Sequence, residues 1–438
     1  MSNVDLTGIA RDLAKRADSG KTIRIGVIGS GEMGTDLVTQ CMLMQGVEIS
    51  IIAARRPHTA FDALKIAYGD DELGRETSSR KAMSEALNMG KIAITADPAL
   101  MVTAPELDVV IDATGKPGVA ADYILMAMEH GKHIVMMNVE ADVTIGPYLK
   151  SEADRLGVGY SLGAGDEPSS CMELIEFASA LGYTIVSAGK GKNNPLKHDA
   201  VPDDFREEAT RRNMNPRMLV EFIDGSKTAV EMAAIANATG LVPDVPGMHG
   251  PKASREELAS VLIPQEDGGV LNKIGVVDYT IGKGVAPGVF VIVKAEHPRI
   301  IERMDDLHVG TGPYYGFFRP YHLTSLEVPL TAARLMIYGK SDMVPLANPV
   351  AEVCALAKRD IAAGEILDSI GETCYRSFTM TVNDARAKSC LPVGLLEGGC
   401  AITSIKKGEL ITSHNATPDN STLLYKTRMK QNAMLKLN

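Results

Sequence analysis

The chain has 438 residues, of which 45% are hydrophobic and 23% charged, and its formal net charge is -10 at pH 7. This balance is typical of a folded protein, and the length predicts more than one domain. An acidic chain lacks the basic surface that general nucleic-acid binding requires, so no nucleic-acid partner is expected. We find no secretory signal, C-x-x-C pair or apolar run of membrane-spanning length, and therefore predict a cytoplasmic protein without a membrane partner.

The first third of the chain alternates apolar runs of strand length with helix-like stretches. The runs are residues 23–28, 47–53, 91–95, 109–113 and 133–137. Strands and helices that alternate at this spacing indicate an α/β fold with a doubly wound parallel sheet, the Rossmann architecture. We place this dinucleotide-binding domain at residues 1–150.

A glycine-rich turn follows the first of these runs and opens a helix. The turn reads G-x-G-x-x-G, in which the first glycine permits a tight turn, the second lets the backbone approach a pyrophosphate, and the third lets helix and strand pack closely. The start of the helix offers free N–H groups to the phosphates. The predicted cofactor-binding residues of this turn are Gly29, Ser30, Gly31, Glu32, Met33 and Gly34.

The end of the second run indicates which dinucleotide binds. NAD enzymes usually place an acid there for the ribose hydroxyls, whereas this strand ends at Ala53 and continues with Ala54, Arg55, Arg56 and Pro57. Two guanidinium groups suit a 2′-phosphate, so Arg55 and Arg56 favour NADPH. The alternative is that both arginines are ordinary surface residues and that the cofactor is NAD.

Polar residues that end later strands of the sheet are further candidates for the cofactor site, because a Rossmann sheet binds its ligand at this edge. Ala113, Thr114 and Gly115 end one strand, and we expect them on the ribose and nicotinamide side. Asn138 and Glu140 end the next and are candidates for contact with the nicotinamide. Ordinary loop polarity is the alternative explanation.

The pattern changes near residue 151, where a second, α+β domain is predicted to extend to residue 345. Its first candidate site is Asp166-Glu167, at a junction between a short strand and a long helix. Two adjacent carboxylates could hold Mg²⁺ or Mn²⁺, which would polarise a carbonyl and a hydroxyl. Acids in front of a helix also stabilise its dipole, which is the structural alternative.

A basic motif, Gly189-Lys190-Gly191-Lys192-Asn193, follows the next strand. In an extended chain Lys190 and Lys192 point the same way, and the glycines would let an anion approach the backbone. The motif predicts a phosphate or carboxylate site with one lysine as proton donor, and Asn193 is grouped with the lysines as a candidate catalytic residue. A solvated basic loop is the alternative.

Two other residues are candidates for the catalytic site. Glu231 lies four residues after Lys227 on a predicted helix, where an ion pair on a solvated face is the simpler explanation. Arg319 ends a glycine- and aromatic-rich loop and could reach an anion from a lid, or the loop could simply be packed.

The last part of the chain, residues 346–438, is predicted to be a small β-rich domain. Residues 357–367 read as a hairpin with its turn at Ala363-Gly364, and a similar unit recurs at 405–411. The two units suggest pseudo-repeated hairpins, followed from Lys426 by a solvated basic tail.

Together, the glycine turn, Asp166-Glu167-Pro168 and the Gly-Lys-Gly-Lys-Asn-Asn motif resemble the bacterial 1-deoxy-D-xylulose 5-phosphate reductoisomerase-like proteins. Those proteins look like homoserine dehydrogenase in the cofactor domain, and residues 357–367 look like the opening of their C-terminal SAF domain. The metal motif here differs from that of the ordinary reductoisomerases, which separate their two acids by one residue.

The resemblance implies an NADPH-dependent reductoisomerase that makes 2-C-methyl-D-erythritol 4-phosphate for isoprenoid biosynthesis. It implies a divalent metal at Asp166 and Glu167, with Lys190 and Lys192 facing a phosphorylated, sugar-like substrate. The alternatives are a homoserine-dehydrogenase-like oxidoreductase acting on another sugar phosphate, sugar acid or hydroxy acid, and a non-catalytic NADP sensor. We also expect a homo-oligomer, either a dimer or a tetramer.

Overall fold

The computed structural model describes residues 6–211 and 215–436. The chain divides into two compact units. Unit 1 consists of Met1–Asp166 and Leu323–Val344, and unit 2 of Glu167–His322 and Pro345–Asn438.

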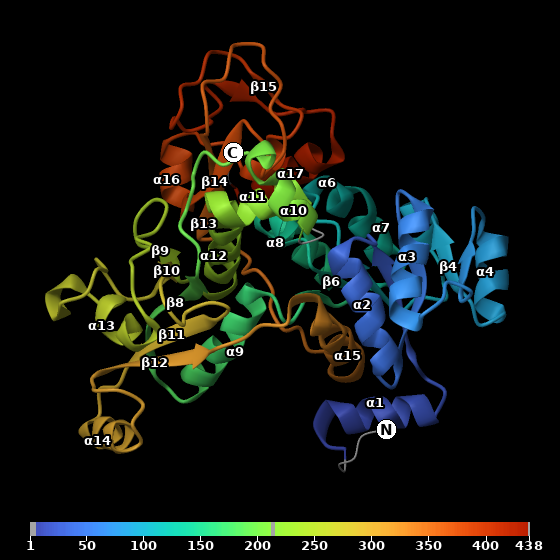
Figure 1. Cartoon of the computed structure of the whole chain (residues 1–438), viewed down its shortest axis with the longest axis horizontal. Helices are drawn as coiled ribbons and strands as arrows, with labels where there is room; N and C mark the ends of the chain where they lie inside the picture. Colours follow the sequence, from blue (N-terminus) through green and yellow to red (C-terminus); the bar gives the residue numbers. More distant parts are fainter. Residues whose placement is uncertain (1–5, 212–214, 437–438) are drawn as a thin grey trace. The chain divides into compact units, whose positions relative to one another are not determined.

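Unit 1 is built on a seven-stranded sheet in which every pair of neighbouring strands is parallel (Figure 1). This confirms the predicted doubly wound sheet, and the short edge strand β3 is the one that the apolar pattern missed. In spatial order the strands are β3 (Gly74–Glu76), β4 (Ile92–Thr95), β2 (Val47–Ala53), β1 (Ile23–Ile28), β5 (Val109–Asp112), β6 (His133–Met136) and β7 (Tyr160–Leu162).

Helices connect these strands and bury apolar side chains against the sheet. The central strand β1 buries Ile23, Ile25 and Val27 completely, as expected of a parallel strand that is covered on both faces. The helices are α1 (Gly8–Asp18), α2 (Glu32–Leu43), α3 (Pro57–Tyr68), α4 (Arg80–Asn88), α5 (Pro98–Val102), α6 (Pro117–Val119), α7 (Leu125–Glu129), α8 (Val139–Leu156) and α15 (Val328–Tyr338).

The boundaries of unit 1 differ from the predicted domain limits. Strand β7 pairs with β6 and so extends the Rossmann sheet beyond residue 150. Helix α15 also belongs to unit 1, because Val328, Ala332 and Leu335 join the same apolar core as strand β1. A segment far along the chain thus completes the core of the first unit, which sequence order alone did not indicate.

Unit 2 contains a mixed five-stranded sheet with β8 at its centre. Strand β8 is parallel to β10 and antiparallel to β11, and helices α9 and α12 pack against it. The strands in spatial order are β12 (Tyr314–Arg319), β11 (Val289–Lys294), β8 (Thr184–Lys192), β10 (Val276–Ile281) and β9 (Val242–Pro243). The helices are α9 (Glu167–Ala180), α10 (Arg206–Arg211), α11 (Pro216–Asp224), α12 (Ser226–Thr239), α13 (Leu258–Val261) and α14 (Pro298–Asp306).

The C-terminal part of unit 2 is rich in β structure, but its pairing differs from the predicted hairpins. Strand β13 (Ala351–Ala357) pairs with β14 (Tyr375–Thr381), so residues 357–367 do not fold back on themselves. Instead each turn bonds to the chain that precedes the other turn: the Gly364 N–H donates to the Ala401 carbonyl at 2.7 Å, and the Gly408 N–H donates to the Ala357 carbonyl at 2.8 Å. The two similar units therefore pair with each other, and the prediction that each forms its own hairpin is wrong.

The remaining elements of this part are helix α16 (Val382–Ala387), the short strands β15 (Cys400–Ala401) and β16 (Ala416–Thr417), and helix α17 (Leu423–Met434). The prediction of a solvated tail from Lys426 is wrong for the described residues, and residues 437–438 lie outside them. In α17, the Arg428 guanidinium is buried and pairs with Glu352 on β13 at 2.5 Å. This ion pair ties the last helix to the sheet.

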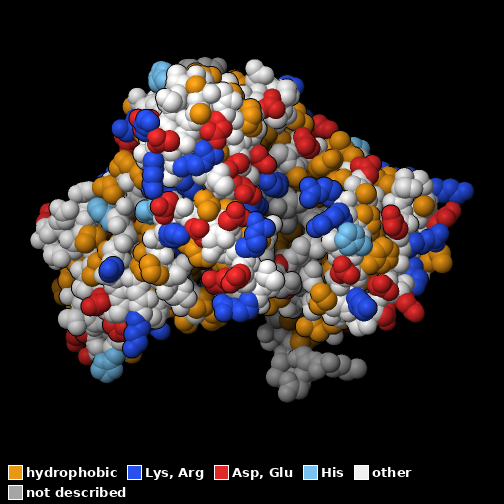
Figure 2. Space-filling model, turned by 45° about the horizontal axis from the view of Figure 1, so that its top comes forward, with side chains coloured by type: hydrophobic (Ala, Val, Ile, Leu, Met, Phe, Trp, Pro, Cys, Tyr) orange, Lys and Arg blue, Asp and Glu red, His pale blue; other side chains and the backbone are white. Residues whose placement is uncertain are grey.

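Figure 2 shows lysine and arginine side chains alongside aspartate and glutamate on the face that it draws. Within the described part of the chain, none of the helices combines the length and the apolar character that a membrane crossing requires.

The Arg428–Glu352 pair provides a test of how α17 is held. Glu352→Ala leaves a buried guanidinium without its carboxylate, which should lower the free energy of unfolding by roughly 3 kcal/mol. Arg206→Ala, which removes an exposed ion pair with Asp203, should cost at most about 1 kcal/mol. Because the chain has no tryptophan, urea unfolding followed by far-ultraviolet circular dichroism is a suitable measurement. Equal effects of the two variants would contradict this account.

Candidate functional site

The glycine turn of unit 1 has the geometry of a dinucleotide-binding loop. Gly29 has a φ of +104°, and a Cβ atom on Gly34 would lie 2.2 Å from the Gly29 carbonyl oxygen. A Cβ atom on Gly31 would meet no atom within 4 Å. The third glycine therefore allows close packing as predicted, and the space beside the second is open at the start of α2, where an anion is favoured.

Arg55 and Arg56 follow strand β2 at the same edge of the sheet, and both are exposed. Among the described residues neither arginine forms an ion pair with an acid. The neighbouring Ser30 hydroxyl lies 2.6 Å from that of Thr59 on α3, which links the glycine turn to the segment that follows β2. The assignment of Arg55 and Arg56 to a 2′-phosphate stays a prediction.

The strand ends at Thr114 and Asn138 are organised by a buried aspartate that the sequence did not single out. Asp112 accepts hydrogen bonds from the Thr114 hydroxyl at 2.6 Å and from the Asn138 amide at 2.9 Å. Burial raises the pKa of Asp112, although both hydrogen bonds oppose the shift. The Asn138 side chain is itself fully buried and caps α8. Helix capping therefore accounts for its position without a contact to the cofactor.

The other cofactor candidates of these strand ends differ in exposure. Ala113 and Gly115 flank Thr114, and no atom lies within 4 Å of a Cβ atom built on Gly115. Glu140 lies in the first turn of α8 and is only 5% exposed. No observation of the structure assigns these residues to a nicotinamide, and their roles stay predictions.

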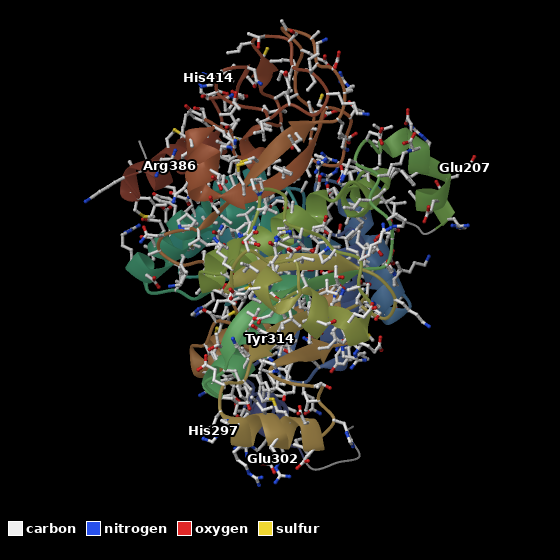
Figure 3. The ribbon with its side chains drawn as sticks, turned by 90° about the vertical axis from the view of Figure 1, so that its left-hand side faces the viewer. Glu207, His297, Glu302, Tyr314, Arg386 and His414 are labelled. Atoms are coloured by element: carbon white, nitrogen blue, oxygen red, sulfur yellow. The ribbon has the colours of Figure 1, made fainter. Side chains whose placement is uncertain are left out.

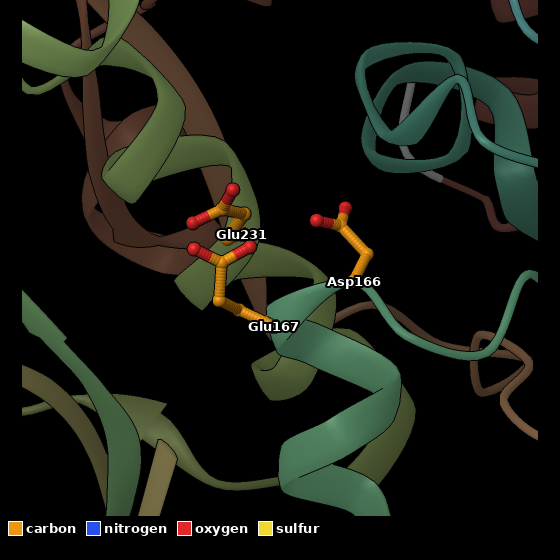
Figure 4. A group of neighbouring side chains, drawn as sticks. All are labelled: Asp166, Glu167 and Glu231. Atoms are coloured by element: carbon orange, nitrogen blue, oxygen red, sulfur yellow. The ribbon is translucent and has the colours of Figure 1, made fainter. Parts of the chain in front are cut away.

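The most unusual group of charges in unit 2 surrounds Lys190. Its ammonium lies 2.5 Å from a carboxylate oxygen of Glu167, the first residue of α9, and also contacts the carboxylate of Glu231 on α12. Lys190 is 5% exposed, Glu167 7% and Glu231 0%. Figure 4 shows the two glutamates extending from their separate helices toward each other. We call Glu167, Lys190, Glu231 and the neighbouring Lys192 the Lys190 centre.

Strand β8 brings Lys192 to the same side as Lys190, as the alternation of an extended chain predicts. The Lys192 side chain is buried, and its ammonium donates to the Phe222 carbonyl at 2.7 Å. Both lysines are therefore inside the protein, and the alternative interpretation of this motif as a solvated basic loop is wrong.

The glycines of this motif have a different role from the one expected. A Cβ atom on Gly189 would lie 1.6 Å from the Asp278 carbonyl oxygen, and one on Gly191 would lie 1.9 Å from that of Val285. The neighbouring backbone, and not an anion, occupies the space that the missing side chains leave. The glycines serve close strand packing.

The charges of the Lys190 centre shift one another's protonation equilibria. Burial alone would lower the pKa of Lys190, but the charges of Glu167 and Glu231 raise it above its usual value. Burial and the positive charge of Lys190 lower the pKa of Lys192 to about 8. Burial and the charge of Glu167 raise the pKa of Glu231 to about 7, against the effect of Lys190. Lys192 and Glu231 therefore titrate near neutral pH, as proton-transfer groups require.

The predicted metal site coincides with this centre. Asp166 is the last residue of unit 1, and within unit 2 the carboxylates of Glu167 and Glu231 both face the Lys190 ammonium. The ammonium contacts Oε1 of Glu167 and Oε2 of Glu231, which is one oxygen of each carboxylate. Glu231 Oε1 is buried and meets no hydrogen-bond partner among the described residues, so the assignment of a divalent metal to Asp166 and Glu167 stays a prediction.

The remaining candidates lie at differing positions relative to the Lys190 centre. Asn193 is exposed in the loop after β8. Arg319, the last residue of β12, binds to two residues of α9. Its guanidinium donates to the Ser170 hydroxyl at 2.9 Å and to the Glu173 carboxylate at 3.0 Å. These contacts hold Arg319 against α9 and do not indicate a lid.

Two further side chains approach the centre. Lys227 Nζ lies 4.0 Å from Glu231, and His322 Nε2 lies 3.5 Å from Glu167. Since Glu231 is fully buried, the explanation of Lys227 and Glu231 as a solvated pair is wrong. The absence of a polar face on α12 could have indicated this, whereas no sequence signal pointed to His322.

Comparison with known proteins agrees with this division of the chain. Residues 29–160 match the family model described as homoserine dehydrogenase, NAD binding domain. Residues 165–328 match the model described as oxidoreductase DRL, catalytic domain. The chain therefore contains a homoserine-dehydrogenase-like NAD-binding domain followed by the catalytic domain of an oxidoreductase.

Individual relatives are more distant. A homoserine dehydrogenase from Methylobacillus glycogenes is 31% identical over 118 residues, which cover 27% of this chain and 25% of that protein. The matched region thus spans about a quarter of the curated relative. A homoserine dehydrogenase structure from Thiobacillus denitrificans has 16% identity and a TM-score of 0.43, covering 89% of this chain and 98% of that one. A probable dehydrogenase from Thermotoga maritima has 14% identity and a TM-score of 0.41, covering 73% and 90%.

The position of the Lys190 ammonium predicts how the chain responds to metal ions. Added Mg²⁺ or Mn²⁺ should leave the thermal unfolding midpoint of the native chain unchanged, because an ammonium already neutralises the two glutamates. Lys190→Ala exposes the carboxylates to each other, so the same ions should raise its midpoint. Lys192→Ala, which keeps Lys190, is the matched control and should not respond. Stabilisation of the native chain by either ion would support the metal site predicted from the sequence.

Proposed function

We propose that the chain is an NAD(P)-dependent oxidoreductase that interconverts an alcohol and a carbonyl group of a small anionic metabolite. Hydroxy acids, sugar acids and sugar phosphates are the substrate classes considered. The observation that carries the proposal is the Lys190 centre, where a buried ammonium with a fixed charge lies beside a second lysine that titrates near neutral pH. Only Gly163 to Asp166 separate the last strand of the dinucleotide-binding sheet from the helix that begins with Glu167.

The roles of the two lysines follow from their surroundings. A nicotinamide cofactor, when bound, accepts or supplies the hydride. An ammonium has three N–H donors, and Lys190 directs donors to Glu167 and Glu231, which leaves one for a substrate oxygen. A charged donor held in a buried site stabilises a developing alkoxide effectively. Lys192, with its lowered pKa, takes the hydroxyl proton during oxidation and returns it during reduction.

This proposal favours simple oxidation or reduction over the reductoisomerase reaction. The resemblance that suggested the rearrangement associates it with a divalent metal, whereas Glu167 and Glu231 here already form ion pairs with the Lys190 ammonium. Turnover of any hydroxy acid, sugar acid or sugar phosphate by the purified protein would count against a non-catalytic NADP sensor. Self-association of the chain and its cytoplasmic location remain predictions.

Two arginines of unit 1 support a preference for NADPH over NADH. Arg55 and Arg56 are exposed beside the glycine turn, where the usual acid is missing, and they favour NADPH over NADH. Loss of one charge-assisted contact to a phosphate costs roughly 1.5–3 kcal/mol, or about ten- to a hundredfold in Kd. Arg55→Asp should therefore abolish or reverse the preference, as measured by titration calorimetry with each cofactor. Equal affinity of the native chain for both cofactors would refute the prediction.

The lowered pKa of Lys192 predicts the pH dependence of catalysis. Oxidation of the alcohol needs the neutral amine, so kcat/KM for the alcohol substrate should rise with pH and level off above about 8. Reduction needs the ammonium, so its kcat/KM should fall over the same range. Lys192→Ala should lower turnover by about a hundredfold or more, the usual scale for a lost general acid or base. NADPH affinity should stay the same.

A charge-preserving variant separates proton transfer from packing. Lys192→Arg keeps a cation but holds its proton throughout the accessible pH range, so the rising limb of the oxidation profile should disappear. A Lys192→Arg enzyme with the native profile would show that another group transfers the proton.

A further inference from the structure

A cavity of unit 2 lies at the start of helix α12, with a volume of about 200 Å³. The segment after β8, the loop before β10 and strand β14 also line it. Its polar lining consists of His198, Thr228, Tyr279, Arg376, Ser377 and Thr379, of which Thr228, Ser377 and Thr379 are almost fully buried. A cavity with this lining can hold a small polar group away from water.

Ser377 is a second polar residue of this cavity, and its hydroxyl group is unsatisfied among the described residues. Its side chain is 1% exposed and lines the cavity, yet within residues 6–211 and 215–436 its Oγ atom meets no hydrogen-bonding group. The Ser377 backbone N–H is already used, since it donates to the Ser226 hydroxyl at 2.9 Å. A buried polar atom without a partner costs roughly 1–3 kcal/mol, so this hydroxyl is suited to a bound ligand.

Arg376 brings a positive charge to the same cavity. Its guanidinium lies 5.6 Å from the ring centre of Phe378 and, in the described part of the chain, forms no ion pair. The nearby acid Asp224 raises the pKa of Arg376, but burial outweighs it and the net shift is downward. Asp224 is neutralised by the buried Lys358 at 2.6 Å. The guanidinium is therefore a partly desolvated cation without a dedicated counter-charge.

Helix α12 adds the third feature. The helix has 14 residues and begins after Gly225, which has a φ of +91° and provides no side-chain cap. The positive end of its dipole, and those first-turn N–H groups that have no acceptor within the helix, lie at this end. Of these groups, the Ser226 N–H is satisfied by Asp224 at 2.8 Å. Gly225 and Thr228 both line the cavity.

We propose that this cavity binds the phosphate group of a small metabolite. An arginine, a hydroxyl donor and the N-terminal end of a helix together form the environment that phosphate favours. The volume is below the roughly 300–1,000 Å³ that is typical of sites for drug-sized ligands, which suits a phosphate group better than a whole cofactor.

The cavity is distinct in position from the Lys190 centre. Lys227 and Glu231 lie on one face of α12, whereas Gly225, Thr228 and Ala229 lie on another, given 3.6 residues per helical turn. None of the four residues of the Lys190 centre lines the cavity. The inference therefore does not depend on the proposed oxidoreductase activity.

Inorganic phosphate is the probe for this site, with the full chain studied by titration calorimetry at constant ionic strength. The native chain should bind phosphate, and Arg376→Met should weaken that binding roughly tenfold or more. Ser377→Ala should weaken it to a smaller extent, because it removes a neutral donor. Arg386→Met is the matched control, since Arg386 is an exposed arginine on α16 outside the cavity (Figure 3), and its affinity for phosphate should be unchanged.

A second control separates this site from the dinucleotide-binding domain. Arg55→Met alters the predicted 2′-phosphate contact in unit 1, so phosphate binding at the cavity should persist in that variant. If Arg55→Met abolished binding while Arg376→Met did not, the inference would be overturned. Equal affinity of the native chain for acetate and phosphate would overturn the assignment to phosphate. Absence of turnover with every substrate would refute the proposed function but leave this measurement unaffected.

Discussion

The arrangement of unit 2 depends on one interaction, the contact of the Lys190 ammonium with two buried carboxylates. Lys190 lies on the central strand, and Glu167 and Glu231 come from two different helices. Removing one partner of a buried ion pair typically costs about 3–5 kcal/mol, because the other charge is left without compensation. This group of three charges therefore links α9 and α12 to β8 in the interior of unit 2.

The same contact explains the chemistry available at the centre. A lysine whose ammonium is paired with two glutamates stays protonated and can donate a hydrogen bond throughout the accessible pH range. Its field disfavours a second positive charge nearby. Burial, together with this field, lowers the pKa of Lys192, two residues further along the strand, to about 8. Two lysines of identical intrinsic chemistry thus acquire different roles, one fixed in charge and the other able to exchange its proton.

Two other buried cations of unit 2 follow the same rule. Lys358 pairs with Asp224, and Arg428 pairs with Glu352, as expected when a charge is removed from water. Arg376 is partly buried next to Ser377, whose hydroxyl is unsatisfied, and it pairs with no acid among the residues that the structure describes. The missing counter-charge at Arg376 is consistent with the proposal that this cavity binds an anionic ligand.

The sequence by itself determined the elements whose pattern is local. The apolar runs from Ile23 to Met136, the glycine turn and the alternation of Lys190 with Lys192 required only neighbouring residues to be interpreted. Tertiary structure decided which distant segments met. Glu167 and Glu231 are 64 residues apart in the sequence, and α15 returns to the core of unit 1 from beyond residue 322. Burial converted Glu231 from half of a supposed surface pair into part of the Lys190 centre, because a charge without access to water must find its partner across the fold.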